Sequence, residues 1–109
     1  MHELAIAESV VATVLERTEE QVVSVVRLRV GRLSGVVPDA LTFCFELATA
    51  GTTLEGAALE IEVQPGRATC RTCSEDFSLD DPILLCPCGS ADVELVSGRE
   101  LAVQSVEVH

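Results

Sequence analysis

The sequence has no tryptophan, no tyrosine, no lysine and only three phenylalanines. Because nearly half of its residues are nevertheless hydrophobic, its core must be aliphatic. Eighteen acidic residues against seven arginines leave a net charge of −11. A chain of this charge repels the phosphate backbone of nucleic acids, so a nucleic-acid-binding function is disfavoured.

The sequence also lacks an apolar run of the roughly 18 residues that a membrane span needs. Its first residues carry neither a basic stretch nor a short apolar segment followed by a cleavage site, so we expect no signal peptide. These absences predict a cytoplasmic protein without membrane association, in which thiols stay reduced. Five cysteines in that compartment indicate metal ligands or reactive thiols rather than disulfides.

The 109 residues are enough for one domain, or for one domain that carries a small additional module. Apolar periodicity predicts a helix over 3–18, a strand over 21–31 and a second helix that begins at Pro38 and ends before Gly51. Strict alternation predicts another strand over 58–64, and alternation resumes at Val93 to form a last strand with a bulge before Val106.

A strand–helix–strand connection favours a right-handed parallel crossover. The fold class predicted is therefore α+β, with two helices packed on a small mixed three-stranded sheet and a four-cysteine module inserted before the last strand.

Four cysteines lie in a polar segment with little periodicity, residues 67–91. Cys70 and Cys73 are spaced C-x2-C, whereas Cys86 and Cys88 are spaced C-x-C around Pro87. Two such turns can supply a tetrahedron of thiolates at about 2.3 Å from a metal ion. Four soft sulfur ligands favour zinc, with iron as the main competitor. Because the second turn is one residue short, we expect a weaker or distorted site.

Two other interpretations of these cysteines stay open. Four buried apolar cysteines in one polar loop would be unusual, and a redox dithiol normally lies at a helix N-terminus, which no pattern after Cys73 indicates. Cys44 is separate, because it falls on the apolar side of the second helix and is interpreted as a core residue.

The N-terminus offers a second kind of metal site. The amine of Met1, the amide nitrogen of His2 and the imidazole of His2 can close adjacent chelate rings in a plane, an arrangement that suits Ni(II) or Cu(II). Glu3 can add a carboxylate oxygen or its backbone nitrogen. Since imidazole and amine must lose protons to bind, we expect nickel affinity to fall as the pH drops through about 6.5.

Several motifs together resemble the HypA/HybF family of hydrogenase maturation, nickel-incorporation proteins. They are Met-His-Glu at the start of a helix, Phe-Cys-Phe-Glu at 43–46, the four-cysteine loop, Cys-Gly-Ser-x-Asp at 88–92 and Val-Ser-Gly-Arg-Glu-Leu at 96–101. The similarity runs from residue 1 to about 108. One departure is the last cysteine pair, which in the family is normally C-P-x-C.

The resemblance implies a non-enzymatic nickel metallochaperone with Ni(II) as its cargo at Met1, His2 and Glu3. It implies structural Zn(II) at Cys70, Cys73, Cys86 and Cys88. It divides the chain into a nickel-binding α/β domain, residues 1–66 and 92–109, and a zinc module, residues 67–91.

The partners that the resemblance implies are a HypB-type GTPase and the large subunit of [NiFe]-hydrogenase, with urease as a further recipient in some organisms. The sequence leaves the oligomeric state undecided, with a homodimer as one alternative. The main alternative is a non-enzymatic zinc-containing adaptor that binds another protein through the zinc loop. A thiol-disulfide enzyme is a further alternative.

Overall fold

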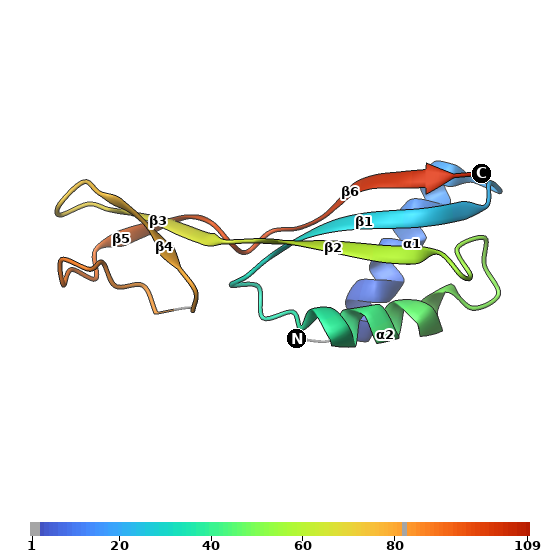
Figure 1. Ribbon diagram of the computed structural model, residues 1–109, viewed down its shortest axis with the longest axis horizontal. Helices are drawn as coiled ribbons and strands as arrows, with labels where there is room; N and C mark the ends of the chain where they lie inside the picture. The colour runs from blue at the N-terminus through green and yellow to red at the C-terminus, as the bar shows by residue number, and fades with distance from the viewer. Residues whose placement is uncertain (1–2, 82) are drawn as a thin grey trace.

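Two three-stranded sheets lie at opposite ends of an elongated molecule (Figure 1). The computed structural model describes residues 3–81 and 83–109. The principal dimensions are 52 × 21 × 17 Å, so the long axis is more than twice either of the others. In the described part of the chain, no helix is long and apolar enough to cross a membrane.

The larger sheet and two helices form the first unit. Along the chain they are α1 (Glu3–Thr18), β1 (Val23–Gly31), α2 (Pro38–Thr49), β2 (Ala58–Gln64) and, near the C-terminus, β6 (Leu101–Val108). The strand order is β2-β1-β6, with β1 parallel to β2 and antiparallel to β6. The predicted mixed three-stranded sheet, its parallel crossover and the bulge before Val106 are confirmed, since the β1–β6 register shifts between Val103 and Ser105.

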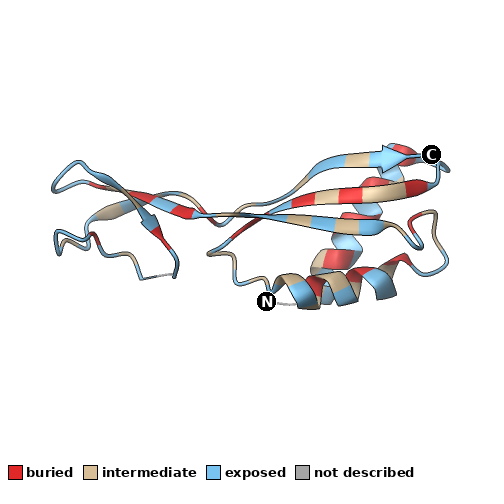
Figure 2. Cartoon of the chain, viewed as in Figure 1, coloured by how far each residue is buried: buried red, intermediate tan, exposed pale blue. Residues whose placement is uncertain are grey.

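The core lies between this sheet and the helices. Figure 2 shows buried residues along the central strand β1 and on the inner sides of both helices. Val26, Leu28 and Val30 of β1 are at most 1% exposed and belong to one cluster with Leu41 and Phe45 of α2. Burial of each such side chain contributes about 1.5–3 kcal/mol. The core is aliphatic apart from Phe45, as the composition predicts.

A second sheet, which the sequence did not predict, carries the cysteine segment. Its strands are β3 (Gly66–Cys70), β4 (Asp76–Leu79) and β5 (Val93–Ser97), in the order β4-β3-β5 with both pairs antiparallel. The single strand predicted from Val93 onward was wrong, because β5 and β6 belong to different sheets. The chain turns between them at Gly98, whose φ is +118°.

A neck of three closely packed segments joins the two sheets. The Gly31 amide donates to the Glu100 carbonyl at 2.7 Å, and the Leu33 amide donates to the Gly98 carbonyl at 2.6 Å. A Cβ atom at Gly31 would lie 2.1 Å from the Gly98 carbonyl, and one at Gly98 would lie 2.7 Å from the Gly66 Cα. Glycine is therefore required where the backbones meet.

Candidate metal centre

The second sheet and its loops bring the four predicted cysteines together. Cys70 is the buried last residue of β3, and Cys73 lies in the turn that leads to β4. In this turn the Ser74 amide donates to the Cys70 carbonyl at 2.9 Å. Cys86 and Cys88 lie in the loop before β5, where the Gly89 amide donates to the Cys86 carbonyl at 2.8 Å. Two tight turns thus present two sulfurs each.

The spacing of the sulfurs matches a tetrahedral metal site. The four Sγ atoms lie within 4.8 Å of one another. Cys70 Sγ is 3.8 Å from Cys88 Sγ, and Cys73 Sγ is 3.6 Å from Cys86 Sγ. A zinc–sulfur distance of 2.3 Å gives a tetrahedron whose edges are about 3.8 Å. The four-cysteine cluster therefore fits structural zinc, and the short Cys86-Pro87-Cys88 turn still places its second sulfur in reach.

Main-chain amides in both turns point at the sulfurs. The Cys73 amide donates to Cys70 Sγ at 3.5 Å, and the Cys88 amide donates to Cys86 Sγ at 3.4 Å. Such hydrogen bonds favour the thiolate form that binds a metal. The C-x-C turn therefore keeps at least one amide–sulfur bond of this kind.

The thiols cannot all ionise together unless a cation is present. The amide of Cys73, together with neighbouring thiols, lowers the pKa of Cys70 to about 6 despite its burial. For Cys86 the amide of Cys88 also favours the thiolate, but burial and the three adjacent cysteine side chains outweigh it and raise the pKa to about 12. A divalent cation removes this repulsion, because the four negative charges then surround a positive one.

Side chains next to the cysteines tie the two turns together, a role that sequence reasoning missed. Thr72 Oγ1 lies 2.8 Å from Ser90 Oγ, which links one cysteine turn to the other. Arg71 donates to Asp92 at 3.0 Å, and the Asp92 amide donates to Ser90 Oγ at 3.1 Å. The Cys-Gly-Ser-x-Asp motif could have indicated these contacts, because its serine, Ser90, contacts Thr72 and its aspartate, Asp92, contacts Arg71.

The predicted nickel site is described only in part. Met1 and His2 lie outside the described residues. Glu3 opens α1, and one of its carboxylate oxygens accepts a hydrogen bond from the Val37 amide at 3.2 Å. Val37 precedes α2 and has no capping side chain of its own, so Glu3 places a negative charge at the positive end of that helix. The start of α1 is thereby attached to the start of α2.

The fold and the four-thiol cluster define a metal-binding protein made of an α/β domain and a small second sheet. The family model described as "Hydrogenase/urease nickel incorporation, metallochaperone, hypA" matches residues 1–108. The chain belongs to this family.

Curated relatives named "Hydrogenase maturation factor HypA" agree with the family match. The protein from Streptomyces avermitilis is 51% identical, over 97% of this chain and 86% of its own length. The one from Nostoc sp. is 43% identical, over 99% of this chain and 96% of its own length. The solution structure titled "Ni metallochaperone HypA from Helicobacter pylori" has the same fold, with a TM-score of 0.67 at 22% identity and coverage of 99% and 97%.

Proposed function

We propose that this chain is a nickel metallochaperone that binds Ni(II) through Met1, His2 and Glu3 and delivers it during maturation of [NiFe]-hydrogenase. The family match, which begins at residue 1 and so includes the Met-His-Glu motif, is the observation that carries the proposal. Nickel is the cargo, so the ligands must hold it without enclosing it. Nitrogen ligands that lie in one plane leave the positions above and below that plane for an acceptor.

The contact of Glu3 with α2 supports a specific role for this residue in the proposed site. Because the carboxylate of Glu3 accepts a hydrogen bond from the Val37 amide, it holds the beginning of α1 in place. We propose that its backbone nitrogen, rather than its carboxylate, completes the nickel ligands. The side chain would then position the site while the main chain binds the ion.

We also propose that Cys70, Cys73, Cys86 and Cys88 hold structural zinc and take no part in catalysis. A closed tetrahedron of four protein ligands leaves no coordination position for a substrate. The domains proposed are residues 1–66 and 92–109 for nickel and 67–91 for zinc. The pairing of β5 with β3 supports moving the second boundary from residue 92 to residue 98.

The partners that we propose are a HypB-type GTPase, which assists transfer, and the large subunit of [NiFe]-hydrogenase, which receives nickel. The family description supports urease as an additional recipient. Free thiols suited to metal binding support a cytoplasmic location.

Calorimetric titration of the zinc-loaded, untagged protein with Ni(II) tests the cargo site. We expect His2→Ala, and a variant with one alanine added before Met1, each to weaken nickel binding at least tenfold. His109→Ala is the matched control, because it removes the chain's other histidine at the far end, and it should bind like the parent protein. Intact-mass measurement verifies the N-terminus. Unchanged affinity in both N-terminal variants would rule out the proposed ligands.

A further inference from the structure

The outer edge of β6 is unpaired within the described residues and borders an apolar groove. In the order β2-β1-β6 this strand ends the larger sheet, so alternate residues direct main-chain N–H and C=O groups away from it. Helix α1 passes beside the edge without closing over it. The groove between them has a volume of about 690 Å³, which is in the range of ligand-binding clefts.

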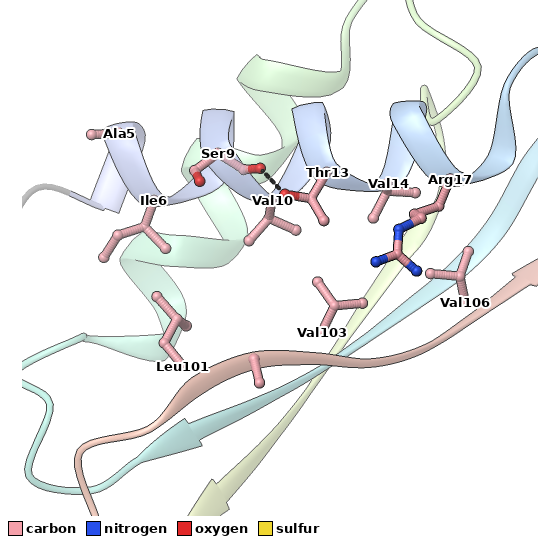
Figure 3. Close-up of a pocket in the computed structure, with 11 residues that line it drawn as sticks. Ala5, Ile6, Ser9, Val10, Thr13, Val14, Arg17, Leu101, Val103 and Val106 are labelled. Carbon is pink, nitrogen blue, oxygen red and sulfur yellow. Dashed lines mark hydrogen bonds between the residues drawn. The ribbon is translucent and has the colours of Figure 1, made fainter.

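Aliphatic side chains from both elements form the interior of this groove. Figure 3 shows side chains of α1 pointing toward side chains of β6 across the open space. The facing residues are Ile6, Val10 and Val14 of α1 and Leu101, Val103 and Val106 of β6. Leu101 is 40% exposed although it lies on the helix side of the sheet. Small polar residues, Ser9 and Thr13, line the groove on the α1 side.

Arg17 is the one charged side chain among the described residues that line the groove. It extends from the last turn of α1 toward Val106 (Figure 3). No ion pair of Arg17 occurs within the described part of the chain, although the protein carries eighteen acidic residues. An arginine without an acidic partner at one end of an apolar groove is complementary to a ligand that is apolar along its length and acidic at one end.

We propose that this groove binds an extended segment of another protein, which pairs with β6 as a fourth strand, places alternate apolar side chains between α1 and β6, and presents an acidic side chain to Arg17. Strand addition of this kind draws affinity from main-chain hydrogen bonds and specificity from pockets for alternate side chains. The lining helix from Ala5 to Arg17 is about 18 Å long, so about five extended residues would fill the groove.

The charge distribution favours a different protein over a second copy of this chain as the occupant. If two β6 strands paired antiparallel about their centres, the strand of the second copy would present no acidic side chain to Arg17, because the β6 residues that line the groove are all apolar. The proposal goes beyond nickel transfer and does not depend on it. It does place the docked segment beside Ala5, two residues after the proposed ligand Glu3.

Selection of random eight-residue peptides displayed on phage, on the full-length zinc-loaded protein, tests the proposal. Peptides that bind are synthesised and titrated by fluorescence anisotropy. We expect a consensus of alternating Val, Ile or Leu with Asp or Glu at one end. In amide NMR spectra, binding should shift Leu101–Val108 and leave the free edge at Ala58–Gln64 unchanged.

Variants locate the binding surface. Ser9→Phe and Thr13→Phe fill the groove and should each weaken binding at least tenfold. Ala12→Phe, an equally exposed position of α1 that does not line the groove, should have no effect. Arg17→Gln should weaken binding about two- to fivefold, as expected for an exposed ion pair. Arg99→Gln is its matched control, and the zinc content and melting temperature of each variant show that it folds.

Several results would overturn the proposal. They are the recovery of no peptide, peptides whose apolar residues recur at helical spacing, or peptides that bind Ser9→Phe and Thr13→Phe as well as the parent. Sedimentation of the protein alone gives another test, because a dimer that dissociates in both groove variants would identify a second copy as the occupant. A bound lipid seen by native mass spectrometry and lost in both variants would also contradict a peptide.

Discussion

The four cysteines differ in their surroundings, although they form one cluster. Cys70 and Cys86 are buried and receive amide hydrogen bonds, whereas Cys73 and Cys88 are exposed. Each turn therefore supplies one inner and one outer sulfur. Exposure of two sulfurs leaves the cluster open to chelators, while the buried pair attaches it to the second sheet.

Removal of one ligand should abolish stable zinc binding. We expect Cys88→Ala to lower the zinc content from about one per chain to well below half, measured by atomic emission after dialysis, because three thiolates leave the fourth position to water. Cys44→Ala removes a cysteine that packs against the core of the first unit and should keep its zinc. Full zinc in Cys88→Ala would show that Cys88 is not a ligand.

Zinc binding should release protons from the thiols. The pKa values of Cys70 and Cys86 belong to the folded cluster, whereas the metal-free second sheet is unfolded and its thiols have an ordinary pKa of about 8.5. These thiols are mostly protonated at neutral pH and must lose their protons to bind the metal. Addition of zinc to the metal-free protein in weak buffer at about pH 7 should therefore release several protons per chain, measured with a pH indicator, and Cys70→Ser should release fewer. A release of no protons would contradict thiolate binding.

At the scale of the elements, the first unit depends on the buried face of β1. Leu28→Ala should lower the free energy of unfolding by about 2–5 kcal/mol, because Leu28 is 1% exposed at the centre of the core. Leu47→Ala on α2, where the side chain is 57% exposed, should change it by no more than about 0.5 kcal/mol. Urea titration followed by circular dichroism measures both. If both variants lost the same free energy of unfolding, Leu28 would not belong to the core.

The neck should tolerate no side chain at Gly31. Because a Cβ atom there would lie 2.1 Å from the main chain of Gly98, Gly31→Ala should cost about 3 kcal/mol, the upper part of the range for overpacking. Gly56 has a φ of +83° but open space around it, so Gly56→Ala should cost only about 1–2 kcal/mol for the left-handed conformation. Thermal unfolding compares the two, and a smaller loss at Gly31 would mean that the neck is loosely packed.

Sequence periodicity predicted the first unit because its strands alternate and its helices are amphipathic. β3 contains Gly66 and only five residues, and β4 has four, so neither is long enough for a periodic signal. The turn at Gly98 was missed because alternation continues across it. The cysteine site was predicted from spacing alone, whereas the contacts of Thr72 and Ser90 depend on how two turns far apart in sequence meet.

At the scale of the whole molecule, the two sheets are separate structural units. The Cα radius of gyration is 16.9 Å, compared with about 13 Å for a compact domain of this length. Among the described residues of the second sheet and its loops, the buried hydrophobic ones are Ala68, Cys70, Leu79 and Cys86, and two of these four are proposed metal ligands. Such a small core cannot fold the second sheet without the metal.

Removal of the metal should therefore unfold one end of the molecule and leave the other intact. After treatment with a strong chelator, we expect amides of β3, β4 and β5 to lose protection from hydrogen exchange, while those of β1 and β2 keep it. The cause is the loss of the binding free energy of zinc, about 10–16 kcal/mol in small zinc-dependent modules.

Cys88→Ala treated with the same chelator is the control, since its second sheet should already be unprotected and should not change further. Protection lost along the entire chain at once would instead mean that the neck of Gly31, Gly66 and Gly98 couples both ends into one cooperative unit. Because the neck hydrogen bonds involve only a few main-chain groups, such as the Gly31 amide and the Gly98 carbonyl, the two ends should respond independently.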